Sequence, residues 1–99
     1  VTQGGASADA FVSQTGSINR SNISQTGVSS VTEVTQDGED NRSTITQSGS
    51  FSSTEIEQTG EGNRSTVGQT GSLAGTSVTQ DGDTNTSTVT QSGFGSSTD

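Results

Sequence analysis

The residues of this 99-residue chain that could take part in covalent chemistry are its serines, threonines and carboxylates. A hydroxyl becomes a nucleophile when a neighbouring base takes up its proton. The chain contains no His, Cys, Lys or Tyr, so no serine has an evident base. We therefore predict no catalytic residue, no cofactor and no enzyme activity. We interpret the hydroxyl residues as small side chains of packed strands.

The acidic residues are the second candidates for chemistry, because carboxylates bind calcium. The segment Asp37–Asp40 lacks the ligand spacing of an EF-hand, and the chain lacks the glycine-rich nonapeptide of calcium-binding β-rolls. We expect solvated turns and no specific metal site. The formal net charge of −8, with only three arginines, also argues against a nucleic-acid partner, because phosphate contacts need cationic side chains.

Side-chain amides recur with a fixed spacing along the whole chain. A glutamine occurs every eleven residues: Gln3, Gln14, Gln25, Gln36, Gln47, Gln58, Gln69, Gln80 and Gln91. Two residues after each comes a glycine: Gly5, Gly16, Gly27, Gly38, Gly49, Gly60, Gly71, Gly82 and Gly93. Two residues before each comes an aliphatic residue: Val1, Val12, Ile23, Val34, Ile45, Ile56, Val67, Val78 and Val89. Self-similarity at a fixed period indicates a repeat architecture.

The composition alone resembles that of a disordered chain, with 20% hydrophobic residues and three aromatic residues. Disorder, however, does not require a Gln-x-Gly element to return every eleven residues. The strict spacing indicates order that comes from stacking of repeats and not from a bulky core. The chain has no Cys for disulfides and no apolar stretch long enough to span a membrane.

Between successive glutamines the residues alternate as in a strand, with side chains on opposite faces. In residues 41–47, for example, Asn41, Ser43, Ile45 and Gln47 share the inward face, and the residues between them face outward. No 3.6-residue stripe indicates a helix. We predict partial strands at both ends and full strands near residues 8–14, 19–25, 30–36, 41–47, 52–58, 63–69, 74–80 and 85–91.

The predicted turns are four residues long, and Asp37–Asp40 is an example. The glycine in each can adopt positive φ at no steric cost. Every second strand begins with an asparagine, and these are Asn19, Asn41, Asn63 and Asn85. The full unit is therefore 22 residues, arranged as strand, turn, strand and turn.

Units of this kind predict an all-β, two-sheet β-solenoid with a cross-β arrangement. We expect one uninterrupted array over residues 1–99, with about four and a half coils, and interpret it as a stretch of a longer array. The inward Gln and Asn amides are expected to hydrogen-bond to their own kind in the coils above and below, as in steric zippers. Open strand edges at the ends of the stack are expected to pair with further copies.

The charges are expected to separate between the outer faces of the two sheets. The Asn-bearing sheet carries all three arginines, namely Arg20, Arg42 and Arg64. The adjacent turns carry acids expected to lie close enough to offset them, namely Glu39, Asp40, Glu61 and Asp83. The other sheet carries Glu33, Glu55 and Glu57.

Residues 30–47 resemble the curlin repeat of bacterial curli subunits. The pattern of that repeat is Ser, five residues, Gln-x-Gly-x-x-Asn-x-Ala, three residues and Gln. The first matching residues are Ser30, Gln36, Gly38, Asn41 and Gln47, with Ser43 in place of alanine. A second copy matches at Ser52, Gln58, Gly60, Asn63 and Gln69, with Ser65 in place of alanine. The flanking copies start with Ala8 and Ala74 in place of serine.

This resemblance implies a structural subunit of an extracellular functional amyloid, which polymerises head to tail into cell-surface fibres of a biofilm matrix. It also implies two partners besides further copies of the chain, a nucleator subunit and an outer-membrane secretion channel. No membrane insertion is expected.

An outward threonine column supports a different function. Thr44, Thr66 and Thr88 are spaced by one 22-residue unit and could order water on a flat surface. The alternative to a fibre subunit is therefore a β-solenoid binding module, either an ice-binding protein or an adhesin stalk.

The turns of one edge carry apolar residues, and these are Val28, Phe51, Leu73 and Phe94. Scattered apolar surface residues are common and need no function. The other interpretation of this edge is a lateral contact between fibres.

Overall fold

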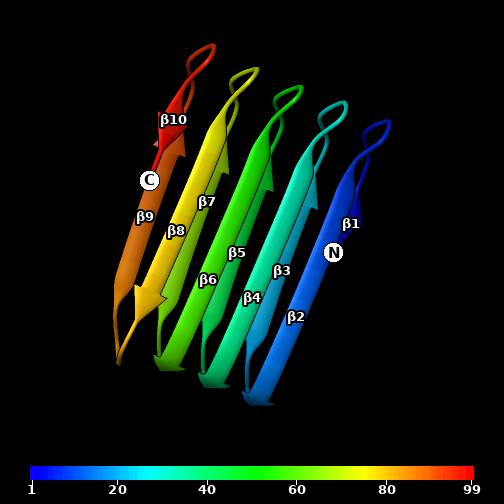
Figure 1. The fold of residues 1–99 in the computed structure, drawn as a ribbon. Coiled ribbons are helices and arrows are strands. Elements are labelled where there is room, and N and C mark those ends of the chain that lie inside the picture. Colours follow the sequence, from blue (N-terminus) through cyan, green and yellow to red (C-terminus); the bar gives the residue numbers. More distant parts are fainter.

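The computed structural model describes residues 1–99 and contains ten strands and no helix (Figure 1). The strands are β1 (Thr2–Gln3), β2 (Asp9–Ser17), β3 (Arg20–Gln25), β4 (Val31–Glu39), β5 (Arg42–Gln47), β6 (Ser53–Glu61), β7 (Arg64–Gln69), β8 (Gly75–Asp81), β9 (Thr86–Gln91) and β10 (Ser97–Thr98). They form two five-stranded sheets, the odd sheet β1-β3-β5-β7-β9 and the even sheet β10-β8-β6-β4-β2. The predicted all-β, two-sheet β-solenoid is confirmed.

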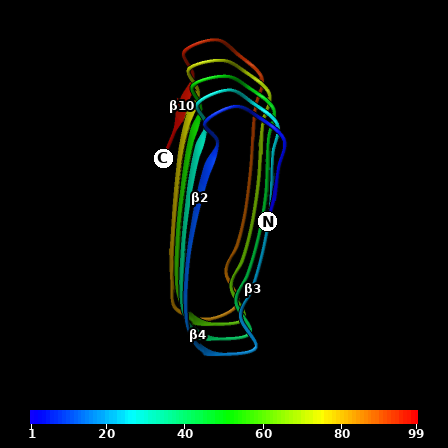
Figure 2. The same cartoon turned by 90° about the vertical axis from the view of Figure 1, so that its right-hand side faces the viewer.

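Neighbouring strands in each sheet are parallel and offset by 22 residues. In the odd sheet Arg42 pairs with Arg64 and Gln47 with Gln69, and in the even sheet Val34 pairs with Ile56. Each coil of one odd and one even strand therefore lies on a nearly identical coil, and Figure 2 shows them as flattened loops one behind another. The Cα extents of 33 × 21 × 11 Å correspond to strand length, coil stacking and sheet separation.

The strand boundaries differ from the predicted ones at both ends. The full strands of both sheets begin one residue later than predicted. In the odd sheet the inward asparagine forms the corner. The backbone N–H of Asn41 donates to the side-chain Oδ1 of Asn19, and regular pairing starts at Arg42, whose N–H donates to the Asn63 carbonyl. In the even sheet, β4 continues through Glu39 because residues 37–39 still pair with the next coil. The predicted four-residue turn Asp37–Asp40 is therefore wrong.

The glycines also differ between the two sets of turns. Positive φ values of 99° to 120° occur at Gly16, Gly38, Gly60 and Gly82. The prediction of positive φ is wrong for the alternate glycines. Turns of the first set have positive φ both at the glycine and two residues later, as at Asp40, whereas in the alternate turns the later residue alone is left-handed. It is Phe51 (φ 55°) after Gly49 and Leu73 (φ 58°) after Gly71. Glycine is needed in those turns for a different reason, which is close packing between coils.

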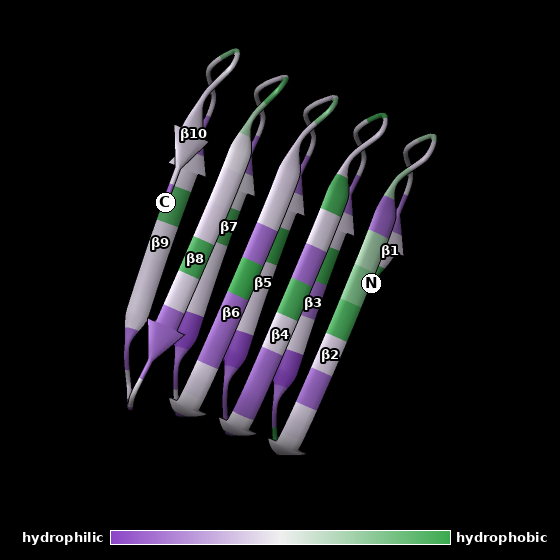
Figure 3. Ribbon diagram, in the orientation of Figure 1, coloured by the Kyte–Doolittle hydropathy of each residue, from purple (hydrophilic) through white to green (hydrophobic).

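The apolar core is a single column of aliphatic side chains between the sheets. It consists of Ile23, Val34, Ile45, Ile56, Val67 and Val78, with Ala10 and Val89 packed against its ends. Figure 3 shows this column as green bands at mid-strand. Val12 lies in β2, the end strand of the even sheet, and is 41% exposed. The end strand of the opposite sheet, β1, has only two residues and covers it poorly. One aliphatic residue per strand is a thin core, so much of the interior is polar.

Candidate functional site

The interior of the solenoid is occupied by ladders, which are columns of equivalent side chains in successive coils. The structure has no pocket and no group of three or more acidic, His or Cys residues that could hold a metal ion. It also has no helix of the length and apolarity that a bilayer crossing requires. The largest buried polar side chains are glutamines and asparagines, so the ladders are the candidate functional feature.

The glutamines of the odd sheet form a continuous hydrogen-bonded ladder. Nε2 of Gln25 donates to Oε1 of Gln47 at 2.8 Å, and Nε2 of Gln47 donates to Oε1 of Gln69 at 2.8 Å. The ladder extends to Gln3 at 3.2 Å and to Gln91 at 3.0 Å. Gln25, Gln47 and Gln69 are fully buried. A buried amide is costly when unpaired, and this arrangement pairs each one along the stacking axis.

A column of threonines from the even sheet completes this ladder. Thr54 Oγ1 accepts a hydrogen bond from Gln47 Nε2 at 2.6 Å and donates to Gln69 Oε1 at 2.9 Å. Thr32 and Thr76 bridge their neighbouring glutamines in the same way. Hydrogen bonds therefore join the coils and also the two sheets. These threonines are absent from the predicted ladder residues; their 22-residue spacing is the signal that identifies them.

The even sheet has a second glutamine ladder without threonine bridges. Its hydrogen bonds run from Gln14 to Gln36 (2.6 Å), from Gln36 to Gln58 (2.8 Å) and from Gln58 to Gln80 (2.7 Å). The Nε2 groups of Gln36, Gln58 and Gln80 also donate to arginine carbonyls of the odd sheet. Gln14 is exposed, because it lies in the terminal strand β2.

The asparagine ladder bonds to the backbone and not from amide to amide. Asn41 Nδ2 donates to the Gly60 carbonyl of the next coil at 2.9 Å and to the Asp37 carbonyl of its own turn at 3.2 Å. Its Oδ1 accepts from the backbone N–H of Asn63 at 3.0 Å. The prediction of side-chain pairing between asparagines is therefore wrong. The cause is the corner position, where strand pairing stops and backbone groups need partners.

The turn glycines allow the coils to approach one another. A Cβ placed on Gly49 would lie 1.6 Å from the carbonyl oxygen of Gly71, and one on Gly27 would lie 1.7 Å from that of Gly49. The Gly71 carbonyl also accepts a hydrogen bond from Ser52 Oγ at 3.0 Å, which holds it in place. Any larger residue would force the coils apart, so these glycines are required by stacking.

Three serines of the odd sheet depart from this pattern of satisfied polar groups. The side-chain oxygens of Ser21, Ser43 and Ser65 are buried and have no hydrogen-bond partner. Each of these serines comes seven residues after a glutamine of the even sheet. Thr32 and Thr54 occupy the corresponding position, seven residues after a glutamine of the odd sheet. The curlin pattern has alanine at the position of these serines.

We expect Ser43→Ala to stabilise the chain by about 1 kcal/mol, because a buried hydroxyl without a partner costs roughly 1–3 kcal/mol. The matched control is Thr54→Val, which removes a buried hydroxyl that makes two hydrogen bonds. It should destabilise the chain by a similar amount, because it removes two buried hydrogen bonds that join the glutamine ladder of the odd sheet to the even sheet. Denaturant unfolding measures both changes. A Ser43→Ala variant less stable than the parent would contradict the assignment.

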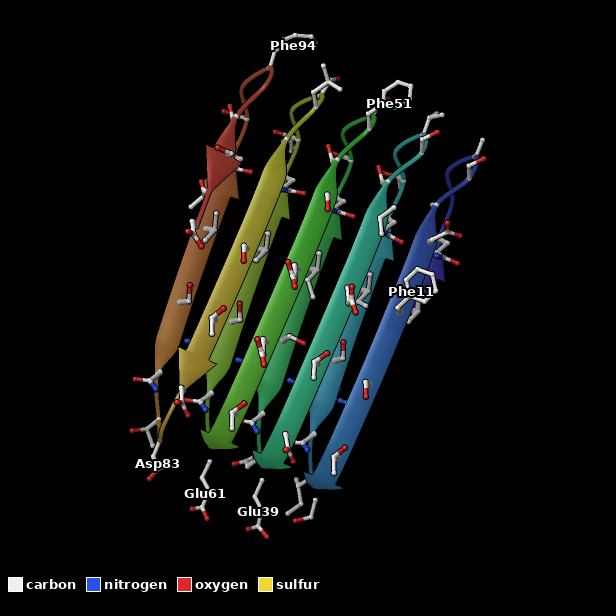
Figure 4. The ribbon with its side chains drawn as sticks, viewed as in Figure 1. Phe11, Glu39, Phe51, Glu61, Asp83 and Phe94 are labelled. Atoms are coloured by element: carbon white, nitrogen blue, oxygen red, sulfur yellow. The ribbon has the colours of Figure 1, made fainter.

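Outside the ladders, the two turn edges have opposite character. Figure 4 shows Glu39, Glu61 and Asp83 projecting from one edge and Phe51 and Phe94 from the other. The apolar side chains are exposed, with fractions of 61% for Phe51 and 80% for Phe94. The three arginines are exposed, and no salt bridge joins them to the turn acids. The turn acids, which were expected to compensate the arginine charges, therefore do not do so through ion pairs.

Comparison with protein-family models matches residues 30–60 to the curlin associated repeat. A search of curated proteins gives no match. The matched residues include β4, β5 and most of β6, and with them members of both glutamine ladders and of the asparagine ladder. The same spacing and the same ladders continue on both sides of this segment. Residues 30–60 therefore match the curlin repeat, and the coils on both sides of them share its spacing.

Proposed function

We propose that the chain is a structural subunit of a secreted, curli-like amyloid fibre, to which further copies add along the solenoid axis. Curlin repeats belong to a structural, non-enzymatic family of extracellular fibres, which supports this role. By the same resemblance, the proposed partners are a nucleator subunit and an outer-membrane secretion channel.

The observation that carries the proposal is the equivalence of the contacts at each step between coils. Gln36 bonds to Gln58 as Gln58 bonds to Gln80, and the backbone register is the same at both steps. Contacts that hold one coil on the next within a chain can hold a coil of one chain on a coil of another. An unpaired strand edge is a template for such addition.

The geometry predicts the orientation of the fibre. The strands run across the stacking direction and pair in parallel register, as in cross-β structures. If copies add along this direction, the fibre axis coincides with the solenoid axis. Growth should add the same hydrogen bonds and the same narrow aliphatic core with each coil, so stability should increase with the number of coils.

The test is to incubate the purified chain and to examine the product by thioflavin fluorescence, electron microscopy and fibre diffraction. We expect thioflavin-positive fibres with an axial reflection near 4.7–4.8 Å, the spacing of stacked strands. Fibres whose strands run along the axis would contradict the proposed direction of growth.

The alternative is a binding module that uses its outward threonines. Thr44, Thr66 and Thr88 are in register on the odd sheet. The column next to them is interrupted by Gly68, and Arg42 is the outward neighbour of Thr44 in β5. Thermal hysteresis from a chain that forms no thioflavin-positive fibres would favour ice binding and would contradict the fibre proposal.

A further inference from the structure

The outer face of the odd sheet is positively charged. Its outward side chains include Arg20, Arg42 and Arg64. In the strand register Arg20 lies beside Arg42 and Arg42 beside Arg64, so the three form one column. The other outward residues of this sheet are threonine, serine, asparagine or glycine. A column of like charges without anionic neighbours on its own face is a surface suited to an anionic partner.

The outer face of the even sheet carries the opposite charge. Its outward acids, all exposed, are Asp9, Glu33, Asp37, Glu55, Glu57 and Asp81. No arginine lies on this sheet. The remaining five acidic residues lie in the turns, at the end of β4 or β6 next to a turn, or at the last position, Asp99. The two broad faces of one molecule are therefore complementary in charge.

The charges also match in position along the strands. The arginine carbonyls accept hydrogen bonds from the even-sheet glutamines: Arg20 from Gln36 (3.4 Å), Arg42 from Gln58 (3.4 Å) and Arg64 from Gln80 (3.2 Å). The arginines thus lie at the level of these glutamines. Three of the even-face acids, namely Asp37, Glu57 and Asp81, are direct sequence neighbours of the same glutamines.

We propose that a second copy of this chain docks with its even face on the odd face of the first, with parallel solenoid axes. A translation perpendicular to the sheets brings the arginine column of one copy opposite Asp37, Glu57 and Asp81 of the other. The chemical basis is ion pairing between guanidinium and carboxylate groups across two flat faces. In fibres, which rest on the function proposed above, this contact joins fibres side by side.

The size and symmetry of the contact predict how it behaves. A face of 33 × 21 Å offers about 700 Å² per partner, close to the roughly 800 Å² of a standard interface. Apart from Phe11 and Val31 on the even face, the outward side chains of both faces are polar, so pairing of single chains is weak. It strengthens along a fibre because the charges recur at each coil. An interface between two different faces does not close on itself, so bundles can keep adding layers.

Charge reversal on each face, singly and together, tests the proposal. Arg20→Glu, Arg42→Glu and Arg64→Glu together change the net charge from −8 to −14, because each substitution contributes −2. Asp37→Arg, Glu57→Arg and Asp81→Arg together change it to −2, and all six restore −8. All six side chains are exposed, so the fold should be retained, which circular dichroism checks. A milder set replaces the three arginines by glutamine.

Electron microscopy at low salt and at about 1 M salt, where the Debye length is about 3 Å, gives the fibre widths. We expect bundles from the parent chain and from the six-fold variant at low salt only. Each three-fold variant should give single fibres. Stronger bundling by the −2 variant than by the parent would overturn the proposal, because it would show that net charge alone governs association. Bundles unaffected by salt and by every face variant would overturn it in favour of the apolar turn edge.

If no fibres form, the proposed function is contradicted, but docking between the two faces is not. The docking is then tested on the chain in solution. Sedimentation at low salt and high protein concentration should then show dimers and larger oligomers for the parent and six-fold variants and monomers for both three-fold variants. Monomers throughout would overturn the proposal. Binding of dextran sulfate to the arginine column, with parent-like bundles from the Arg→Glu variant, would assign that column to an anionic polymer instead.

Discussion

Gly49→Ala is expected to destabilise the solenoid by about 3 kcal/mol, at the upper end of the cost of overpacking. The Cβ would lie 1.6 Å from the Gly71 carbonyl oxygen, which is backbone and cannot rotate away. Gly49 does not have positive φ, so the loss would come from separation of the coils and not from backbone strain. Chemical or thermal unfolding of the variant measures the loss.

The matched control is Gly68→Ala, in strand β7. A Cβ on Gly68 would have no atom within 4 Å, and this glycine does not have positive φ. The substitution should stabilise the chain by about 0.4–1 kcal/mol, because alanine restricts the unfolded chain more than glycine does. Equal stability of the two variants would disprove the requirement for glycine in stacking.

The fold could be predicted because stacking imposes its period directly on the sequence. A buried glutamine such as Gln47 needs an identical amide above and below it, which requires parallel coils in strict register. Each strand must also supply one aliphatic residue to the core, as Ile45 does. These two requirements return with every coil, so the chain repeats them without insertion. The 22-residue coil and the two parallel sheets follow from that regularity.

The corners could not be predicted, because their geometry depends on contacts made by the next coil. The Asn41 side chain forms the corner through bonds to backbone groups of the next coil, which strand alternation does not reveal. Gly38 and Gly49 recur identically in the sequence but act differently. Gly38 combines a φ of 120° with close packing, and Gly49 has close packing alone.

The polar contacts across the sheets were equally hidden from strand alternation. Thr54 and Ser43 occupy corresponding inward positions in the two sheets, yet only Thr54 reaches a glutamine. A one-dimensional pattern does not show which hydroxyl lies within hydrogen-bond distance of a glutamine. The glutamine ladders themselves were predicted from period and inward position together.

Gln58→Lys is expected to be the most damaging ladder substitution, because it places a charge at a fully buried position of the even sheet. Lysine has no acceptor for Gln36 Nε2, and its ammonium group would replace an amide that donates to Gln80 Oε1. An uncompensated buried charge costs about 3–5 kcal/mol. We expect partial or complete unfolding and a loss of fibre growth, and Gln36→Lys should behave alike.

Gln14→Lys separates folding from assembly in the same ladder. Gln14 is exposed in the terminal strand β2, so its lysine can remain in solvent and stability should change by less than about 0.5 kcal/mol. If copies add along the solenoid axis, this position becomes buried against another chain, and fibre growth should slow although the monomer folds normally. Unfolding curves and thioflavin kinetics of both variants distinguish the two effects. Parent-like growth from Gln58→Lys would contradict the ladder as the basis of assembly, and parent-like growth from Gln14→Lys would contradict addition at that end.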